Sequence, residues 1–375
     1  MRSLATVLGA GLSLLLITGT SADAQTKSGK SATKPVATIN VGFNSALDQI
    51  AVPVGVELGF FEDRGLEAKL APAFASGVEA LNALQAGNVD FVHVGAPLQG
   101  AMISGMDVVY IGGYTGTAVR VRSDEAFELV ARQGSGIDPK DLTTFKGKKI
   151  ASTLGSTNHL YVRNLLFSKG LKAEDFTLIN TPPPEMSVAM KTGGVDAMVC
   201  WDPWPVITRR DNPGSYTVTR GGGYVANVGY MVARRDYAEK NPDIIERFLA
   251  ARAESDQWVR KNPNEAAEIA TRWIPGTNVD VAKESMQFVT KMLDGRVSGC
   301  TVLGMQDGMD FTVEMRKLPQ SVDVTKHVRA AASSKVEEKY PQFFADLPKI
   351  PDGAKLPGDD LSKWDKEAAK KACPL

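Results

Sequence analysis

Short apolar stretches of strand length alternate with longer amphipathic stretches along most of the chain. Residues 38–43 alternate apolar and polar positions, as a half-buried strand does, whereas residues 89–94 are mostly apolar. The predicted strands are residues 38–43, 67–70, 89–94, 108–112, 149–152, 176–179, 195–200 and 224–232. The predicted helices between them are residues 48–58, 78–86, 96–104 and 158–169, and most are followed by the glycine that often ends a helix. This alternation predicts an α/β fold with largely parallel sheets.

One helix–strand unit occurs twice in the sequence. Residues 76–97 align with residues 182–203 without a gap. The matched positions are Glu79 with Glu185, Gly87 with Gly193, Val89-Asp90 with Val195-Asp196, and Pro97 with Pro203. The alternative is that any two helix–strand units look alike, but matched polar and turn positions favour a true repeat. The repeat predicts two equivalent lobes whose loops face one crevice at the carboxyl ends of the strands, where open α/β sheets bind ligands.

The order of the elements also suggests where the lobes begin and end. Gly221-Gly222-Gly223 precedes a strand that would return the chain to the first lobe. We therefore expect lobe 1 to comprise residues 36–134 and 227–375, and lobe 2 to comprise residues 135–226. Two later helices start at Asn241-Pro242 and Asn262-Pro263, a capping residue followed by a proline in the first turn. They belong to a C-terminal helical extension, and beyond Lys317 the pattern predicts no function.

The N-terminus has the pattern of an export signal. Arg2 precedes an apolar run over residues 4–17, and Ala22-Asp23-Ala24 has the small-x-small form of a cleavage site. The alternative, a membrane anchor, would need about 20 apolar residues, and the run is shorter. We expect a signal peptide at residues 1–24, a flexible leader at residues 25–35 and a location in the periplasm.

Composition excludes some classes of partner. Lys plus Arg and Asp plus Glu are equal at 43 each, so the chain lacks the net basic charge of a nucleic-acid binder. His93, His159 and His327 do not share metal-ligand spacing with the cysteines, and we expect neither a metal nor another cofactor. Of the 3 cysteines, Cys200 lies in an apolar strand and is expected to be the free thiol. Cys300 and Cys373 can then form a disulfide that holds the C-terminal tail, but the sequence leaves this pairing open.

Several motifs together resemble a known family. They are residues 55–66, 75–77, 86–90, 145–151 with 155–157, 193–197 with 201–204, and 232–237, and their sequences include Gly59-Phe60-Phe61, Ala86-Gly87-Asn88-Val89-Asp90 and Trp201-Asp202-Pro203-Trp204. In this order they resemble the nitrate/sulfonate/taurine-type substrate-binding proteins of ABC importers, from about Val36 to Asn262. The resemblance implies a type II-like periplasmic-binding-protein fold, two lobes joined by a two-strand hinge, and delivery of a ligand to an inner-membrane ABC permease. It implies a binding protein and not an enzyme, and we expect a monomer. Beyond Trp273 the chain departs from the family.

The ligand site should lie at helix starts that face the crevice, where free backbone N–H groups favour an anion. The candidate residues are Phe43, Asn44, Ser45, Ser76, Gly77, Gly95, Ala96, Ser156, Thr157, His159, Trp201, Asp202, Asn227 and Tyr230. Ser76, Thr157 and Asp202 have capping as an alternative role. The return strand has no carboxylate between Val225 and Tyr230, which argues against an aminosulfonate. A sulfonate, another small oxyanion, a carboxylate or a heterocycle all fit these residues.

Enzymes on the same fold are the alternative. Desulfinases related to this family attack a sulfinate with a cysteine near the first strand, but Asn44-Ser45 occupies that region and the first cysteine is Cys200. Pyrimidine-synthesising relatives need a cysteine-rich segment that is absent here. The sequence therefore favours a binding protein over a periplasmic enzyme of either type.

Overall fold

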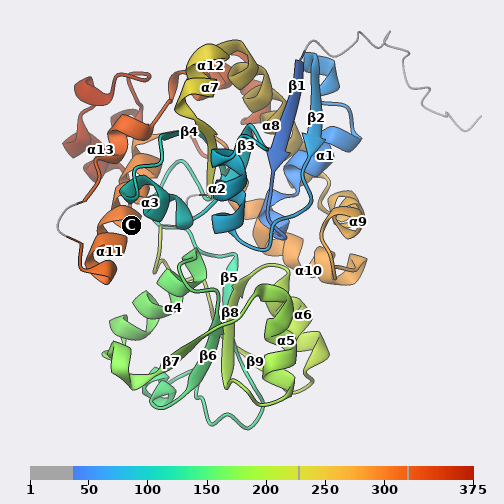
Figure 1. The fold of residues 1–375 in the computed structure, drawn as a ribbon, viewed down its shortest axis with the longest axis vertical. Helices are drawn as coiled ribbons and strands as arrows, with labels where there is room; N and C mark the ends of the chain where they lie inside the picture. Colours follow the sequence, from blue (N-terminus) through green and yellow to red (C-terminus); the bar gives the residue numbers. More distant parts are fainter. Residues whose placement is uncertain (1–36, 227–228, 319–320) are drawn as a thin grey trace, which may run out of the picture. The chain divides into compact units, whose positions relative to one another are not determined.

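Two five-stranded sheets organise the part of the chain that the computed structural model describes, residues 37–226, 229–318 and 321–375 (Figure 1). The first sheet has the order β2 (Leu66–Leu70), β1 (Ala37–Gly42), β3 (Phe91–Val94), β10 (Gly229–Arg234) and β4 (Val108–Thr115). The second has the order β7 (Thr177–Asn180), β6 (Lys149–Ser152), β8 (Ala197–Trp201), β5 (Phe127–Ala131) and β9 (Tyr216–Arg220). The expected signal peptide, residues 1–24, and leader, residues 25–35, lie outside the described residues.

The two sheets have the same plan. In the first, β1 runs parallel to β2 and β3, and β10 is antiparallel to β3 and β4. In the second, β6 runs parallel to β7 and β8, and β5 is antiparallel to β8 and β9. Each sheet with its helices is here called a lobe, the first and the second. The predicted α/β class with two lobes is confirmed.

The sequence repeat occupies equivalent places in the two lobes. Helix α2 (Gly77–Gln85) leads into β3, and α5 (Pro183–Lys191) leads into β8. The repeated aspartate has the same role in both copies. The backbone N–H of Asn40 donates to Asp90 Oδ2 (2.8 Å), and that of Lys149 donates to Asp196 Oδ2 (3.0 Å). Each carboxylate thus ties the turn before its strand to the neighbouring strand, which explains why both copies keep Val-Asp.

Two strands and one boundary differ from the sequence prediction. Neither β5 nor β9 was predicted, because β5 contains the charged Glu128 and β9 alternates over only five residues. Glu128 is buried because Arg209 and Arg220 pair with it. The predicted first segment of lobe 1 ends at residue 134, but β5 ends at Ala131 and belongs to the second sheet. We therefore propose that the second lobe begins before Phe127. The return strand β10 starts at Gly229, later than predicted.

The remaining helices pack on the sheets and extend the first lobe. They are α1 (Ala51–Glu57), α3 (Pro97–Ile103), α4 (Thr157–Ser168), α6 (Trp204–Asp211), α7 (Arg235–Lys240), α8 (Pro242–Lys261), α9 (Pro263–Trp273), α10 (Val279–Val289), α11 (Gly299–Arg316), α12 (Ala331–Lys339) and α13 (Lys366–Ala372). The predicted helix over residues 48–58 is split, with a 3-10 turn at Leu47–Gln49 before α1. Asn241 and Asn262 do not cap the helices that follow. Their side-chain amides donate back to the carbonyls of Tyr237 and Trp258 and close the preceding helices.

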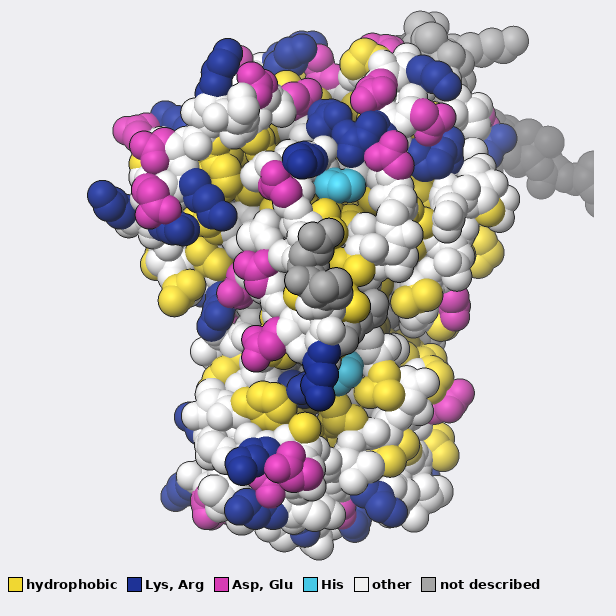
Figure 2. Space-filling model, turned by 60° about the vertical axis from the view of Figure 1, so that its left-hand side comes forward, with side chains coloured by type: hydrophobic (Ala, Val, Ile, Leu, Met, Phe, Trp, Pro, Cys, Tyr) yellow, Lys and Arg dark blue, Asp and Glu magenta, His cyan; other side chains and the backbone are white. Residues whose placement is uncertain are grey.

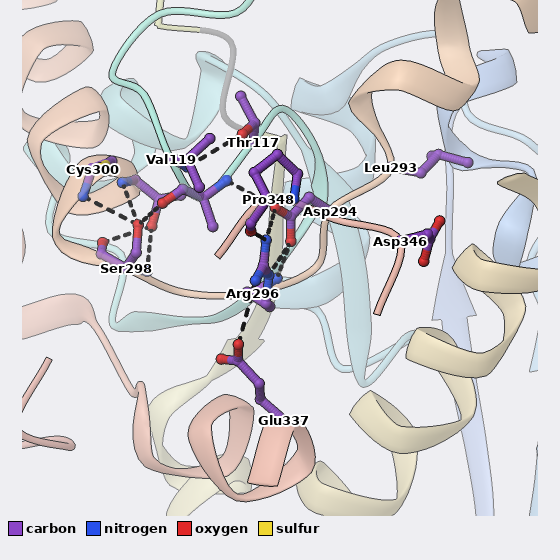
Figure 3. A network of polar contacts seen from close by, with 12 residues as sticks. Thr117, Val119, Leu293, Asp294, Arg296, Ser298, Cys300, Glu337, Asp346 and Pro348 are labelled. Atoms are coloured by element: carbon purple, nitrogen blue, oxygen red, sulfur yellow. Dashed lines mark hydrogen bonds and ion pairs between the residues drawn. The ribbon is translucent and has the colours of Figure 1, made fainter. Parts of the chain in front are cut away.

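The C-terminal extension is fastened to the segment that carries the chain from β4 to β5, residues 116–126. Asp294 Oδ2 accepts a hydrogen bond from the backbone N–H of Ala118 (3.1 Å), and Ser298 Oγ donates to the carbonyl of Ala118 (2.6 Å). Arg296 holds Asp294 through two hydrogen bonds of 2.8 Å and also contacts Glu337 (Figure 3). Cys300 and Cys373 form a disulfide that joins the start of α11 to the end of α13. The extension therefore holds the segment that connects the two sheets against the first lobe.

The surface charges can be compared with the composition, and the helices with the requirements of a membrane span. Basic and acidic side chains are interspersed on the face shown in Figure 2, in line with the balanced composition. No helix within the described ranges combines the length and the apolar character that a membrane span requires.

Candidate ligand site between the lobes

A small cavity lies where the carboxyl ends of the strands of the two lobes meet. Its lining residues come from both lobes: Asn44, Ala46, Asp48, Gln49, Gly77, Gly95, Pro97 and Tyr114 from the first, and Phe127, Ser156, Thr157 and Trp201 from the second. The volume open to the centre of a water molecule is about 40 Å³. This space holds a few water molecules at most, so a larger ligand can enter only when the lobes move apart.

The first lobe builds its side of the cavity from the chain that follows β1 and β3. The backbone N–H of Asn44 donates to Gln49 Oε1 (2.7 Å), and its side-chain amide donates to the carbonyl of His93 (3.4 Å). These bonds fix the loop between β1 and the 3-10 turn that carries Asp48. Gly77 begins α2, and a Cβ added there would lie 2.9 Å from Val94 Cγ2. The close packing of helix on strand therefore needs a glycine at this position.

The second lobe contributes the start of α4 and the end of β8. Thr157 Oγ1 accepts a hydrogen bond from the backbone N–H of Ala96 (3.0 Å), which joins the lobes directly at the cavity rim. A Cβ added at Gly95 would lie only 2.4 Å from Thr157 Oγ1, so the contact depends on that glycine. Ser156 Oγ donates to the carbonyl of Thr153 (2.7 Å) and orders the turn before α4.

Further hydrogen bonds join the lobes beside Trp201. The backbone N–H of Leu47 donates to the carbonyl of Asp202 (3.1 Å). The indole N–H groups of Trp204 and Trp201 both donate to the carbonyl of Ser45, at 2.9 and 3.4 Å. The loop after β1 is therefore held against the loop after β8, and the lobes are closed on one another in this structure.

Asp48 dominates the electrostatics of the cavity. The pKa of Asp48 is raised to about 7, mainly by burial and to a smaller extent by the Asp202 carboxylate, while the Thr115 hydroxyl and the Arg252 charge oppose the shift. Arg252 is itself buried and paired with Asp256, with Arg252 Nη2 2.8 Å from Asp256 Oδ1. Its Nη1 lies 3.2 Å from His93 Nε2, and burial together with Arg252 lowers the pKa of His93. Arg252 is thus paired with Asp256, although its charge still lowers the pKa of Asp48.

The structure brings six of the predicted site residues together at the cavity. They are Asn44, Gly77, Gly95, Ser156, Thr157 and Trp201. Two more lie at its rim through backbone atoms, Ser45 and Ala96. Asn227 lies outside the described residues.

The other predicted residues have structural partners. Phe43 is buried against Trp273, and Ser76 caps α2 by accepting a hydrogen bond from the N–H of Glu79 (3.4 Å). His159 Nδ1 accepts from the N–H of Gly155 (3.1 Å), and burial lowers the pKa of His159 to about 4. The hydroxyl of Tyr230 accepts from the amide of Gln99 (3.2 Å). None of these four side chains lines the described cavity.

Asp202 is buried on the second-lobe side and paired within its own lobe. Arg220 Nη1 lies 2.7 Å from Asp202 Oδ2, and Arg220 also pairs with Glu128. Burial is the main cause that raises the pKa of Asp202 to about 6, and Arg220 opposes that shift. Its side chain is therefore occupied, and it does not line the cavity.

Sequence reasoning missed the lining residues Ala46, Asp48, Gln49, Pro97, Tyr114 and Phe127. The polar pair Asp48-Gln49 inside an otherwise apolar segment was a usable signal, since both side chains are buried. Tyr114 and Phe127 gave no such signal. They lie on β4 and β5, strands that enter different sheets, and only the tertiary fold brings them to one cavity.

Within the described residues, no group of His, Cys, Asp and Glu side chains is arranged to hold a metal ion. The free thiol among them is Cys200, which is buried in β8, and burial raises its pKa. A thiol in this state is a poor nucleophile, because the thiolate is the reactive form.

Solved structures with the same architecture define the class of fold. The alkanesulfonate-binding protein SsuA from Xanthomonas axonopodis pv. citri, solved with MOPS bound, superposes with a TM-score of 0.69 at 22% identity, covering 79% of this chain and 99% of that one. The desulfurization enzyme DszB superposes with a TM-score of 0.63 at 13% identity, covering 81% and 99%. The chain therefore has the two-lobed α/β fold of periplasmic binding proteins, which an enzyme also uses.

Sequence comparison then gives the family. Residues 32–274 match the NMT1-like family, and the chain belongs to it. A putative aliphatic sulfonates-binding protein of Bacillus subtilis (strain 168) is 26% identical over 315 residues, covering 82% of this chain and 90% of the relative. The taurine-binding periplasmic protein of Escherichia coli (strain K12) is 28% identical over 260 residues, covering 66% and 77%. These relatives carry the names of binding proteins, in line with the resemblance read from the motifs.

Proposed function

We propose that this protein is the periplasmic solute-binding component of an ABC importer. It captures a small molecule between its lobes and delivers it to an inner-membrane permease. The observation that carries the proposal is the cavity between the lobes, built from loops of both sheets and closed by direct hydrogen bonds at its rim. The binding-protein names of the relatives support it. The expected signal peptide, periplasmic location and monomeric state belong to the same proposal.

Binding and hinge closure are one equilibrium in this mechanism. The open form admits the ligand, and a ligand that contacts residues of both lobes favours the closed form by its additional contacts there. The hydrogen bonds of Thr157 and Leu47 form across the lobes and contribute only to the closed form. The permease would then recognise the closed surface.

An enzyme on the same fold, desulfinase-like or pyrimidine-synthase-like, is the alternative function. A desulfinase-like mechanism needs a reactive cysteine in the cleft. Neither the loop after β1 nor the described cavity lining contains one, and Cys200 is buried in β8. The binding function is therefore favoured.

A thermal-shift screen tests the proposal. The mature protein, refolded once to remove any bound compound, is screened against sulfonates, other oxyanions, carboxylates and heterocycles, including members that carry amines. A saturable rise in melting temperature, with the compound recovered unchanged, supports a binding protein. Small-angle X-ray scattering with the same compound should show a smaller radius of gyration. Turnover of the compound would instead support the enzyme.

A further inference from the structure

The described lining of the cavity contains one acidic side chain and no basic one. Asp48 is the one carboxylate among the described lining residues, and these include neither Lys, Arg nor His. A bare oxyanion would therefore meet a carboxylate and find no cationic side chain in this lining. Backbone N–H groups at the start of α4 can bind an acidic group of a ligand. They carry no full positive charge, so they do not replace a cationic partner for Asp48.

Asp48 is also poised to accept a further partner. The residue is only 7% exposed, and its Oδ1 atom has no hydrogen-bond partner within the described structure. Leaving a buried carboxylate oxygen unpaired costs free energy, so the position is stabilised when a donor arrives.

The charged groups near Asp48 are already paired with other residues, and the nearby hydroxyl of Thr115 brings no positive charge. Arg252, on α8, is paired with Asp256 and contacts His93. Asp202, from the second lobe, is paired with Arg220 and carries the same sign of charge as Asp48. Tyr114, on β4, stays protonated because burial and the Asp48 charge raise its pKa, so it adds no second negative charge to the cavity.

Three aromatic side chains share the cavity with Asp48. Tyr114 comes from the first lobe, and Phe127 and Trp201 come from the second. Aromatic faces attract cations, most strongly when water is excluded, and aromatic cages are a recurring site for ammonium groups. Aromatic residues on both lobes mean that a cationic group gains contacts when the lobes close.

From the charge and the walls of the cavity, and resting on the proposed function, we infer that the ligand carries a cationic nitrogen that contacts Asp48 and the three aromatic side chains. The nitrogen is protonated or quaternary. Where the ligand also carries an acidic group, that group faces Ser156 and Thr157 at the start of α4. The lack of a carboxylate between Val225 and Tyr230 argued against an aminosulfonate ligand. Asp48, in the loop after β1, supplies a carboxylate from another place and reverses that expectation.

Matched pairs of probes test the inference by isothermal titration calorimetry on the mature protein. The pairs are 2-aminoethanesulfonate with ethanesulfonate, 3-aminopropanoate with propanoate, and choline with 3,3-dimethylbutanol, and each differs only in the cationic nitrogen. We expect at least one nitrogen-bearing member to bind about 100-fold more tightly than its partner. An uncharged or purely anionic member that binds as tightly as its partner, or failure of all three nitrogen-bearing members to bind, overturns the inference.

The variant Asp48→Asn gives the second arm. It should weaken binding of the nitrogen-bearing probe at least about tenfold. Binding of the uncharged 3,3-dimethylbutanol should stay almost unchanged, and the anionic partners should bind at least as tightly as they do to the wild type, because the repelling carboxylate is gone. Asp107→Asn, at an exposed carboxylate on the surface of the first lobe, is the matched control and should bind like the wild type. Melting temperatures confirm that both variants fold. If amine-free probes bind and close the lobes, the proposed function stands and only the ligand inference fails; if no probe of any class closes the lobes, the proposed function fails as well.

Discussion

The contact between Gly95 and Thr157 makes lobe closure sensitive to a single methyl group. In Gly95→Ala the added Cβ would lie 2.4 Å from Thr157 Oγ1, a distance that cannot be tolerated without movement. Overpacking of this kind costs about 1–3 kcal/mol. The displaced hydroxyl also loses the N–H of Ala96, which adds about 1 kcal/mol. Because the clash exists only when the lobes are closed, we expect ligand affinity to fall roughly 30-fold or more.

A second substitution separates the clash from the lost hydrogen bond. Thr157→Ala removes the hydroxyl and should weaken binding by about 1–2 kcal/mol, roughly 5- to 30-fold. In the double variant, the nearest atom to the new Cβ is the Cβ of residue 157, at an ordinary 3.7 Å. The double variant should therefore bind about as well as Thr157→Ala alone, with a coupling free energy of at least about 1 kcal/mol.

Isothermal titration calorimetry of the four proteins measures this cycle, using the compound that the thermal-shift screen identifies. The ligand-free variants should keep the wild-type melting temperature, because neither position belongs to a lobe core. Wild-type affinity in Gly95→Ala would refute the reasoning. So would strictly additive losses, since these would mean that the two positions do not meet in the bound state.

Other predictions test the aromatic wall, the buried carboxyl and the disulfide. Trp201→Ala should weaken ligand binding about tenfold or more while the protein stays folded, since the residue lines the cavity; unchanged affinity would remove it from the site. The affinity for a nitrogen-bearing ligand should rise about tenfold from pH 6 to pH 8, because Asp48, with its pKa raised to about 7, must lose a proton before it can pair with the cation; a fall over this range would contradict the assignment. Asp48→Asn should also stabilise the ligand-free protein more at pH 8 than at pH 5, because ionisation of a buried carboxyl with a raised pKa destabilises the folded protein as pH rises toward that pKa. Equal changes in melting temperature at both pH values would argue against a buried charge. Cys300→Ser should lower the free energy of unfolding by up to ~4 kcal/mol, because the disulfide joins cysteines at a sequence separation of 73. It should change ligand affinity less than twofold, and urea unfolding and calorimetry measure the two effects.

The repeated helix–strand unit is the part of the fold that the sequence predicts best. Glycine stops and apolar runs are local signals, so most strands of the parallel cores start within a few residues of their predicted positions. Strand β5 escapes this reasoning because Glu128 reads as a surface residue until Arg209 and Arg220 arrive from distant segments. Burial of a charge by partners far along the chain leaves no local trace.

Some residues of the candidate site could likewise be predicted from local sequence, whereas others are revealed only by the tertiary fold. Gly77, Gly95, Ser156 and Thr157 could be predicted because helix starts after strands converge on the crevice of any such fold. His159 and Tyr230, predicted as ligand-binding residues, do not line the described cavity, and the sequence does not reveal that their side chains contact Gly155 and Gln99. Asp48 was also missed. The polar pair Asp48-Gln49 in an apolar segment was a usable signal of burial, but its place in the cavity lining follows only from the tertiary fold.

The C-terminal extension adds contacts that bear directly on hinge motion. Glu284 on α10 pairs with Arg209 and Arg210 on α6 of the second lobe, and the Arg220 guanidinium lies 3.9 Å from the ring centre of Phe288. These contacts form between lobes, so they favour the closed state in the absence of ligand. Meanwhile the Asp294 and Ser298 contacts hold the crossing segment on the first-lobe side. In the proposed mechanism, the residues beyond the family match, after residue 274, therefore shift the equilibrium between the open and closed forms of the ligand-free protein. Any free energy that favours the empty closed form reduces the fraction of open protein that can bind a ligand.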